Sequence, residues 1–250
     1  MCGRYVAASP RAVLEERFQA TPRQQDDAGQ EPSWNVAPTD VEPVVTLRKG
    51  ERRLEDFRWG LVPSWSKNMD GGPRMINARA ETLMSRRAFQ VPMTKRRCLV
   101  PADGYYEWLK RTGPDGRPER LPFYFTPADD QGFAFAGLWD VWKSPEGEWV
   151  PTFTIITVDA NQAVAPIHDR MPAALRREDW DAWLDTDRVD PRRALEVLEH
   201  PVPADSMVSW PVGKAVNSVR NNAPQLVVPT EGHAPRQGNL LADVGGGDDD

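Results

Sequence analysis

The sequence has few of the residues that build metal centres and disulfide frameworks. Its 250 residues include two cysteines, Cys2 and Cys98, and three histidines, His168, His200 and His233. None of them is spaced like the ligands of a zinc site, and a single potential disulfide is far below the density of a secreted disulfide-stabilised domain. We therefore predict a protein without a metal or another cofactor, in a reducing environment.

Long apolar runs are absent as well. No window approaches the roughly 18 consecutive apolar residues of a membrane-spanning helix, and the first residues lack the apolar stretch of a secretory signal peptide. These absences predict a soluble, cytoplasmic protein with no membrane partner. Nothing in the sequence indicates an obligate oligomer, so we expect a monomer.

Charge is unevenly distributed along the chain. The net charge is -6, yet residues 1–110 hold 18 Lys and Arg against 14 Asp and Glu, and the acidic excess closes the chain at 248–250. This balance argues against a protein that coats nucleic acid, whereas a local basic face in the N-terminal half suits a short contact with phosphates. We predict one folded domain over residues 2–229 and a disordered acidic tail over residues 230–250.

The order of apolar and polar residues predicts a strand-rich fold. With 40% hydrophobic residues the chain can bury a sizeable core. Short β-branched or aromatic runs bounded by turn residues predict strands at Pro43–Arg48, Leu54–Trp59, Cys98–Ala102, Pro122–Phe125, Phe133–Trp142 and Trp149–Val158. Helical spacing predicts helices at Pro10–Phe18 with Ser9 as N-cap, Glu81–Phe89, Arg177–Leu184 and Pro191–Leu198, and polar residues predict a loop at Ala20–Ser33. Because strands and helices do not alternate regularly, we expect a single α+β domain with a curved, mainly antiparallel, barrel-like β core flanked by short helices.

Cys2 carries the most distinctive chemistry. Removal of Met1 would leave Cys2 at the N-terminus, with an amine and a thiol on adjacent carbons. An α-amine has a pKa of about 8 and a thiol one of about 8.5, so both are available as nucleophiles near neutral pH. This 1,2-aminothiol condenses with an aldehyde, such as the ring-opened sugar of an abasic DNA site, to an imine and then to a thiazolidine. Taken alone, position 2 is also consistent with a frayed chain end without a function.

Three further segments hold candidate site residues. Asn77 and Arg79 are two residues apart, so an extended backbone places an amide that can orient a sugar beside a guanidinium that can bind phosphate. Glu107 is a lone acid among aromatic residues, where burial would raise its pKa and suit it to proton transfer. His168 lies between prolines and is a candidate general acid or base. The structural alternatives are a solvated loop, an exposed acid and a histidine bonded to the chain.

Six segments occur in one order, and this order resembles the SRAP family, the SOS-response-associated peptidases, which is similar to abasic-site-processing proteins. The segments are Met1–Tyr5, Trp34–Thr39, Arg58–Trp65, Ile76–Thr82, Pro101–Trp108 and Ile167–Pro172. The resemblance extends from Cys2 to about Pro229 and implies the SRAP fold. Residues 20–33 and the tail after Pro229 lie outside it.

The resemblance implies a catalytic role for four residues. Cys2 would form the thiazolidine crosslink, and Asn77 would hold the opened sugar. Glu107 and His168 would move the protons needed for sugar opening, imine formation and ring closure.

Five more residues would contact DNA. Arg79 would bind a phosphate next to the abasic site, and Arg4 would contact a phosphate beside the nucleophile. Gly3 would let the backbone pass close to the sugar. Pro38 and Trp65 would stack against or wedge the bases of a single strand.

The predicted function is an abasic-site-processing enzyme that senses abasic sites in single-stranded DNA and shields them in a covalent crosslink during the DNA damage response. An AP lyase side activity and autoproteolytic exposure of Cys2 could accompany it. The first rival is a cysteine peptidase with Cys2, His168 and Glu107 as nucleophile, base and orienting residue. The second is a non-covalent reader of single-stranded DNA in which Cys2 is structural.

Overall fold

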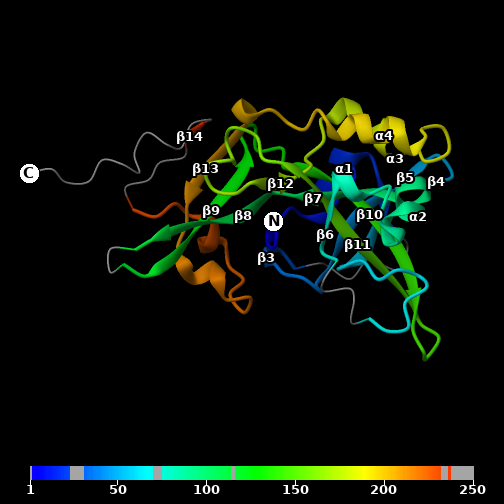
Figure 1. Ribbon diagram of the computed structural model, residues 1–250, viewed down its shortest axis with the longest axis horizontal. Coiled ribbons are helices and arrows are strands. Elements are labelled where there is room, and N and C mark those ends of the chain that lie inside the picture. The colour runs from blue at the N-terminus through cyan, green and yellow to red at the C-terminus, as the bar shows by residue number, and fades with distance from the viewer. Residues whose placement is uncertain (1, 23–30, 70–74, 114–115, 232–235, 238–250) are drawn as a thin grey trace, which may run out of the picture.

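The computed structural model describes residues 2–22, 31–69, 75–113, 116–231 and 236–237, which form two β-sheets and several short helices (Figure 1). The first sheet contains, in spatial order, β14 (Arg236–Gln237), β13 (Met207–Pro211), β9 (Pro118–Pro127), β8 (Gly104–Thr112), β1 (Tyr5–Ala7) and β3 (Ser33–Val36). The second contains β12 (Arg170–Pro172), β11 (Trp149–Asp159), β10 (Phe133–Lys143), β7 (Arg97–Ala102), β4 (Val41–Arg48), β5 (Glu51–Trp59) and β2 (Thr21–Pro22), with β6 (Asn77–Arg79) added beside β11.

The second sheet closes into a barrel. Strand β5 runs parallel to β11, with Arg58 opposite Thr152 and Trp59 opposite Phe153. Strands β11, β10, β7, β4 and β5 therefore form a ring, and all other neighbours in this ring are antiparallel. The predicted single α+β domain with a curved, mainly antiparallel, barrel-like core is confirmed.

The barrel strands are buried on both faces where helices cover them. Every residue of β7 is buried, because one face points into the barrel and the other meets α2 (Arg87–Lys95) and α3 (Trp180–Leu184). Trp183 of α3 is fully buried and donates from Nε1 to the carbonyl of Cys98, at 2.8 Å. This packing makes the predicted strand at Cys98–Ala102 a central element of the core.

Three of the four predicted helices are confirmed, as α1 (Arg11–Phe18), as the 3-10 turn η3 (Arg177–Asp179) followed by α3, and as α4 (Pro191–Leu198). The predicted N-cap of the first helix is wrong. Pro10 occupies that position, and its carbonyl accepts from the amide of Val13 at 2.9 Å. The hydroxyl of Ser9 instead donates to the carboxylate of Asp103. The same carboxylate accepts hydrogen bonds from the backbone amides of Ala8 and Ser9, so it holds the whole segment before the helix.

The predicted helix Glu81–Phe89 is also wrong. The chain forms the 3-10 turn η2 (Ala80–Thr82), further turns, and then α2, which begins at Arg87. Pro92 within α2 argues against a helix there. However, burial of Phe89, Pro92 and Met93 on one helical face outweighs the lost hydrogen bond.

In the described part of the chain, eight strands have no counterpart among the predicted strands: β1, β3, β2, β6, β8, β12, β13 and β14, of which β6 is Asn77–Arg79 and β12 is Arg170–Pro172. The first two are short, and the outer half of β8 is exposed, so their sequences lack a clear alternation. The predicted loop at Ala20–Ser33 contains β2 and the first residue of β3, and residues 23–30 lie outside the described part of the chain.

The predicted tail at 230–250 falls mostly outside the described residues; within it, β14 pairs with β13. In the described part of the chain, no helix is long and apolar enough to cross a membrane.

Candidate active site and DNA-binding surface

The N-terminal strand brings Cys2 to Glu107. Tyr5 lies opposite Tyr105 in the antiparallel pair of β1 and β8, and the amide of Tyr106 donates to the carbonyl of Arg4 at 3.0 Å. Continuing this register places the residues just before β1 beside Glu107, which is 3% exposed. Strand pairing therefore brings the predicted nucleophile Cys2 close to the predicted acid Glu107.

A second strand brings Asn77 to the same place. Its Nδ2 donates to the carbonyl of Cys2 at 2.7 Å, and β6 is fixed by parallel pairing with β11, where Asn77 lies opposite Ile155. The side-chain oxygen Oδ1 of Asn77 is buried and has no hydrogen-bond partner among the described residues. A buried acceptor of this kind costs free energy unless a donor reaches it. The amine of Cys2 or a hydroxyl of a bound sugar would be such a donor.

The thiol of Cys2 is held in its protonated form. Cys2 is fully buried, and its Sγ lies 3.8 Å from the carbonyl oxygen of Arg4. Burial raises the pKa of this thiol far above its ordinary value, and the nearby carboxylate of Glu107 raises it further. Any reaction in which this sulfur acts as a nucleophile therefore requires a group that removes its proton.

Two phenols adjoin this polar pocket. Tyr5 and Tyr105 are buried, interact electrostatically with Cys2, and have hydroxyls without a hydrogen-bond partner among the described residues. Burial raises the pKa of both phenols well above the usual value. Tyr5 packs edge-on against Trp59 with ring centroids 5.1 Å apart, which fixes the wall of the pocket. Both tyrosines lie in segments that were singled out, yet only the pairing of β1 and β8 shows that they surround Cys2.

His168 belongs to the turn before β12. Its Nδ1 lies 3.0 Å from the amide nitrogen of Arg170 and 2.8 Å from Oδ1 of Asp169. The first contact needs a lone pair on Nδ1 and the second needs a proton there, so only one of the two is a hydrogen bond at a time. Both contacts hold the imidazole within its turn.

Arg170 ties this turn to the segment that carries Asn77 and Arg79. Its guanidinium donates to both carboxylate oxygens of Glu81 in η2 and to the carbonyl of Thr157 in β11. Arg170 is 7% exposed, and its bidentate contact has the geometry that makes such pairs strong. Arg170 therefore positions the turn that carries His168 relative to η2. It lies within the segment Ile167–Pro172, for which the sequence predicted no role for this arginine.

A groove opens beside Gly3 and Arg4. Trp108, Arg120 and Asn217 complete its lining. Nε1 of Trp108 donates to Oδ1 of Asn217 at 2.7 Å, which holds the indole at the wall. Two arginines and an indole suit a nucleic-acid strand, since they offer charge for phosphate and a face for a base. Arg120 and Asn217 lie outside the six segments, and no sequence signal marked them.

Arg4 is oriented by a buried amide. Its Nη1 donates to Oδ1 of Asn35 at 2.7 Å and to the carbonyl of Val216 at 3.0 Å. Nδ2 of Asn35 in turn donates to the carbonyls of Ser218 and Asn221. Asn35 therefore joins β3, the N-terminal segment and the C-terminal turns, a role that was not predicted.

The other predicted DNA-contacting residues lie on different loops. Arg79 is exposed at the end of β6. Trp65 is 54% exposed, and the guanidinium of Arg87 lies 4.7 Å from its ring centroid. Pro38 is half-buried and precedes Thr39, whose φ of 85° is strained for a β-branched residue. The strained turn fixes the direction in which Pro38 is presented.

The structure thus brings Cys2, Asn77 and Glu107 together in one cluster. It places His168 in a turn linked to β6 through Arg170 and η2. Among the described residues, no group of three or more His, Cys, Asp or Glu side chains is placed to hold a metal ion. The chemistry available to these residues is acid–base and nucleophilic.

The chain belongs to the SOS response associated peptidase (SRAP) family, whose model matches residues 1–219. The resemblance seen in the six sequence segments is therefore confirmed.

Individual relatives cover nearly the whole chain. It is 39% identical over 230 residues to the abasic site processing protein YoqW of Bacillus subtilis (strain 168). The alignment covers 91% of this chain and 99% of that protein. It is 36% identical over 277 residues to the abasic site processing protein HMCES of Gallus gallus, with 95% of this chain and 80% of that protein covered. A crystal structure of a protein from Bacteroides thetaiotaomicron superposes with a TM-score of 0.81 at 26% identity, covering 92% of this chain and 100% of that one.

Proposed function

We propose that this protein processes abasic sites in single-stranded DNA by forming a covalent thiazolidine crosslink through Cys2. The names of the relatives support abasic sites as the substrate. The observation that supports the chemistry is Asn77, whose Nδ2 donates to the carbonyl of Cys2 while its Oδ1 is buried without a partner among the described residues. The crosslink would shield the site during the DNA damage response.

The reaction begins once Met1 is removed and the amine of Cys2 is free. The amine nitrogen attacks the aldehyde carbon of the ring-opened sugar, and the resulting carbinolamine loses water to give an imine. Sγ then attacks the imine carbon, and the thiol proton ends on the ring nitrogen. The balance is one aldehyde and one aminothiol giving one thiazolidine and one water, without an oxidant or a reductant.

Proton transfers in this sequence fall to Glu107 and His168. Expulsion of water requires an acid, and attack by Sγ requires a base because the Cys2 thiol is protonated in the folded chain. Glu107 is buried and acts electrostatically on that sulfur, which makes it the base for ring closure. His168, held within its turn, supplies the acid for opening of the sugar.

The state of the thiol disfavours the cysteine peptidase alternative. A peptidase cysteine is activated as a thiolate by a neighbouring cation or base that lowers its pKa. Here burial and Glu107 raise the pKa of Cys2. An aldehyde trap does not need a resting thiolate, because the amine attacks first.

DNA would bind across the groove and the loops beside it. Arg4 and Arg120 line the groove, and Arg79 is exposed at the end of β6, so phosphates on either side of the sugar would meet guanidinium groups. Trp65 and Pro38 would stack against or wedge flanking bases, which requires an unpaired strand.

The test is incubation of the purified protein with a single-stranded oligonucleotide that contains one abasic site, followed by a denaturing gel and intact-mass measurement. Mass first confirms that the protein begins at Cys2. We expect a heat-stable adduct equal in mass to protein plus DNA minus one water, and none with intact DNA.

A Cys2→Ser variant separates the two chemical steps. It keeps the amine but lacks the thiol, so we expect an adduct only when borohydride traps the imine. A stable adduct from Cys2→Ser without reductant would contradict ring closure by sulfur. No adduct from wild-type protein that begins at Cys2 would contradict the crosslink and make peptide hydrolysis the next activity to assay.

A further inference from the structure

The hairpin of β8 and β9 carries positive charge on one of its faces. Figure 1 shows these two strands running from beside the N-terminus toward the side of the molecule away from helices α1 to α4. Trp108 lies opposite Pro122 and Lys110 lies opposite Arg120, so all four side chains share one face. Since Trp108 and Arg120 also line the groove beside Arg4, this face continues the groove outward.

Two like charges meet on this face. Lys110 and Arg120 are both exposed, and neither side chain forms a hydrogen bond or an ion pair with another described residue. Like charges at directly opposite positions destabilise a pair of strands. An anion bound between the two side chains would remove this repulsion.

The other face of the hairpin is neutralised within the protein. Arg111 lies opposite Glu119, and its Nε donates to Oε2 of that carboxylate at 3.0 Å. Nζ of Lys214, in the 3-10 turn η5 (Lys214–Asn217), donates to Oε1 of Glu119 at 2.6 Å. Within the described residues, the hairpin thus pairs the charges of one face and leaves two cations of the other face without a partner.

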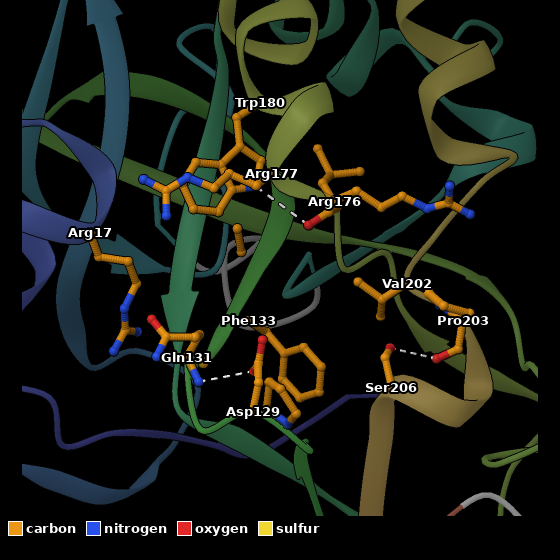
Figure 2. A pocket seen from close by; sticks show the side chains of 14 residues that line it. Arg17, Asp129, Gln131, Phe133, Arg176, Arg177, Trp180, Val202, Pro203 and Ser206 are labelled. Carbon is orange, nitrogen blue, oxygen red and sulfur yellow. Dashed lines mark hydrogen bonds between the residues drawn. The ribbon is translucent and has the colours of Figure 1, made fainter.

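Positive charge elsewhere in the molecule has acidic neighbours. Figure 2 shows Arg17 and Asp129 at the same cavity beside α1. Nη1 of Arg17 lies 3.9 Å from Oδ1 of Asp103. The charge of this arginine is therefore offset within the protein, whereas Lys110 and Arg120 face solvent.

The spacing on the hairpin fits a nucleic-acid strand. Trp108 and Lys110 are two residues apart, which is about 7 Å along a β-strand. At roughly 3.4 Å per nucleotide, this distance corresponds to about two stacked nucleotides. A base stacked on Trp108 would therefore bring a phosphate about two nucleotides further along within reach of Lys110 and Arg120.

We propose that Lys110 and Arg120 form a phosphate-binding site, so that single-stranded DNA which leaves the groove at Trp108 continues along this face of the hairpin. The site rests on the proposed function for its ligand and adds a polarity to it. The protein contacts a longer stretch of DNA on one side of the abasic site than the groove alone would reach. Because the contact is with the backbone, it is independent of base sequence.

The first experiment measures the salt dependence of binding, with the full chain and a fluorescein-labelled oligothymidylate that has no abasic site. The double variant Lys110→Gln/Arg120→Gln should reduce the slope of log affinity against log salt by about 0.7, the value for one phosphate of a single strand.

Two single variants form a matched pair. Lys110→Gln should weaken binding about threefold at low salt, because it removes one cation from the site. Arg111→Gln removes the adjacent cation on the other face, where Lys214 still holds Glu119, and should leave the affinity unchanged. Anisotropy titrations measure both affinities.

Two further oligonucleotides test the polarity. Each carries one tetrahydrofuran residue, an abasic analogue without an aldehyde, and the long flank lies on the 5′ side in one and on the 3′ side in the other. The double variant should weaken binding of one of them about fivefold and leave the other within about twofold, because only one flank reaches the hairpin.

Four results would overturn the proposal. They are an unchanged salt slope in the double variant, equal losses in Lys110→Gln and Arg111→Gln, equal weakening of both flanked oligonucleotides, and a lower urea midpoint for Lys110→Gln, which would show that the opposed cations stabilise the hairpin. None of these measurements requires a crosslink. A failed adduct assay would therefore contradict the proposed function alone, and loss of the hairpin effect with the adduct retained would contradict this site alone.

Discussion

The two cysteines occupy sites of equal burial and different polarity. Cys2 and Cys98 are both fully buried, and burial raises the pKa of both thiols. Each also lies near a buried glutamate: Glu107 raises the pKa of Cys2 further, whereas at Cys98 the lowering by Arg48 exceeds the raising by Glu55. Accessibility and thiol ionisation therefore do not distinguish the two sites.

The difference lies in what surrounds each sulfur. Cys98 faces Gly137 across β7 and β10, and a Cβ added to that glycine would lie 2.9 Å from its Sγ, so no space remains there. Glu55 is held by two partners, because its Oε2 accepts from Thr46 and Arg48.

Around Cys2, Asn77 keeps an unpartnered oxygen, and the residues that follow Cys2 line an open groove. The proposed reactive thiol thus differs from Cys98 by an unsatisfied polar neighbour and by the groove that the next two residues line.

The largest expected effect separates the two cysteines directly. Cys2→Ala should abolish the heat-stable adduct with abasic single-stranded DNA and leave non-covalent affinity within about twofold, because it removes only the sulfur. Cys98→Ala should retain the adduct and lower the free energy of unfolding by about 1 kcal/mol, as a core deletion does. Denaturing gels, fluorescence anisotropy and urea unfolding measure the three quantities. A stable adduct from Cys2→Ala would require a different nucleophile.

Glu107 and Glu55 allow the two cysteine sites to be compared by a second pair of substitutions. Glu107→Gln removes the proposed base while keeping the shape of the side chain, so we expect crosslinking to slow by about 10²- to 10⁴-fold. Glu55→Gln, the matched change beside Cys98, should leave the rate unchanged. Single-turnover gels give both rates, and anisotropy should show equal DNA binding. Equal rates for Glu107→Gln and the wild type would remove Glu107 from the proton transfers.

A smaller effect concerns phosphate binding near Cys2. Arg79→Ala should reduce the slope of log affinity against log salt by about one unit, the value for one lost phosphate contact. Arg188, whose side chain is 89% exposed after α3, provides the control, and Arg188→Ala should not change the slope. Anisotropy titrations at several salt concentrations measure it. A slope unchanged by Arg79→Ala would mean that this arginine does not touch phosphate.

A last effect should be shared by both cysteines and appears only at alkaline pH. Their raised pKa values in the folded chain mean that the thiols ionise only in the unfolded chain once the pH passes about 8.5. The unfolded state then holds fewer protons than the folded one, so stability is full below that pH and falls above it, by about 1.4 kcal/mol per group and pH unit.

Buried Tyr5 and Tyr105 should add to this loss above about pH 10. Urea unfolding from pH 8 to 10.5 measures the decline. Cys2→Ala and Cys98→Ala should each make it shallower by a similar amount, and a decline that neither variant alters would contradict protonated thiols in the folded state.

Much of the fold could be predicted because its barrel strands carry local signals. The runs at Phe133–Trp142 and Trp149–Val158 are β-branched or aromatic and fall within β10 and β11. Prediction failed where a local rule was overridden. Pro92 argued against α2, but burial of Phe89 and Met93 decided the helix. Strands β1 and β3 are too short for a periodic signal, yet β1 is the strand that carries Cys2 to its partners.

The sequence by itself determined the family, the type of fold and the special chemistry of a cysteine at position 2. These follow from residue types and from segments in a fixed order, which need no coordinates. Only the tertiary structure decided that Asn77 and Glu107 meet Cys2, that Arg170 links the His168 turn to β6, and that Arg120 and Asn217 line the groove. Contacts between residues far apart in the chain depend on strand pairing and packing, and burial sets both the pKa of a thiol and the cost of an unpartnered oxygen.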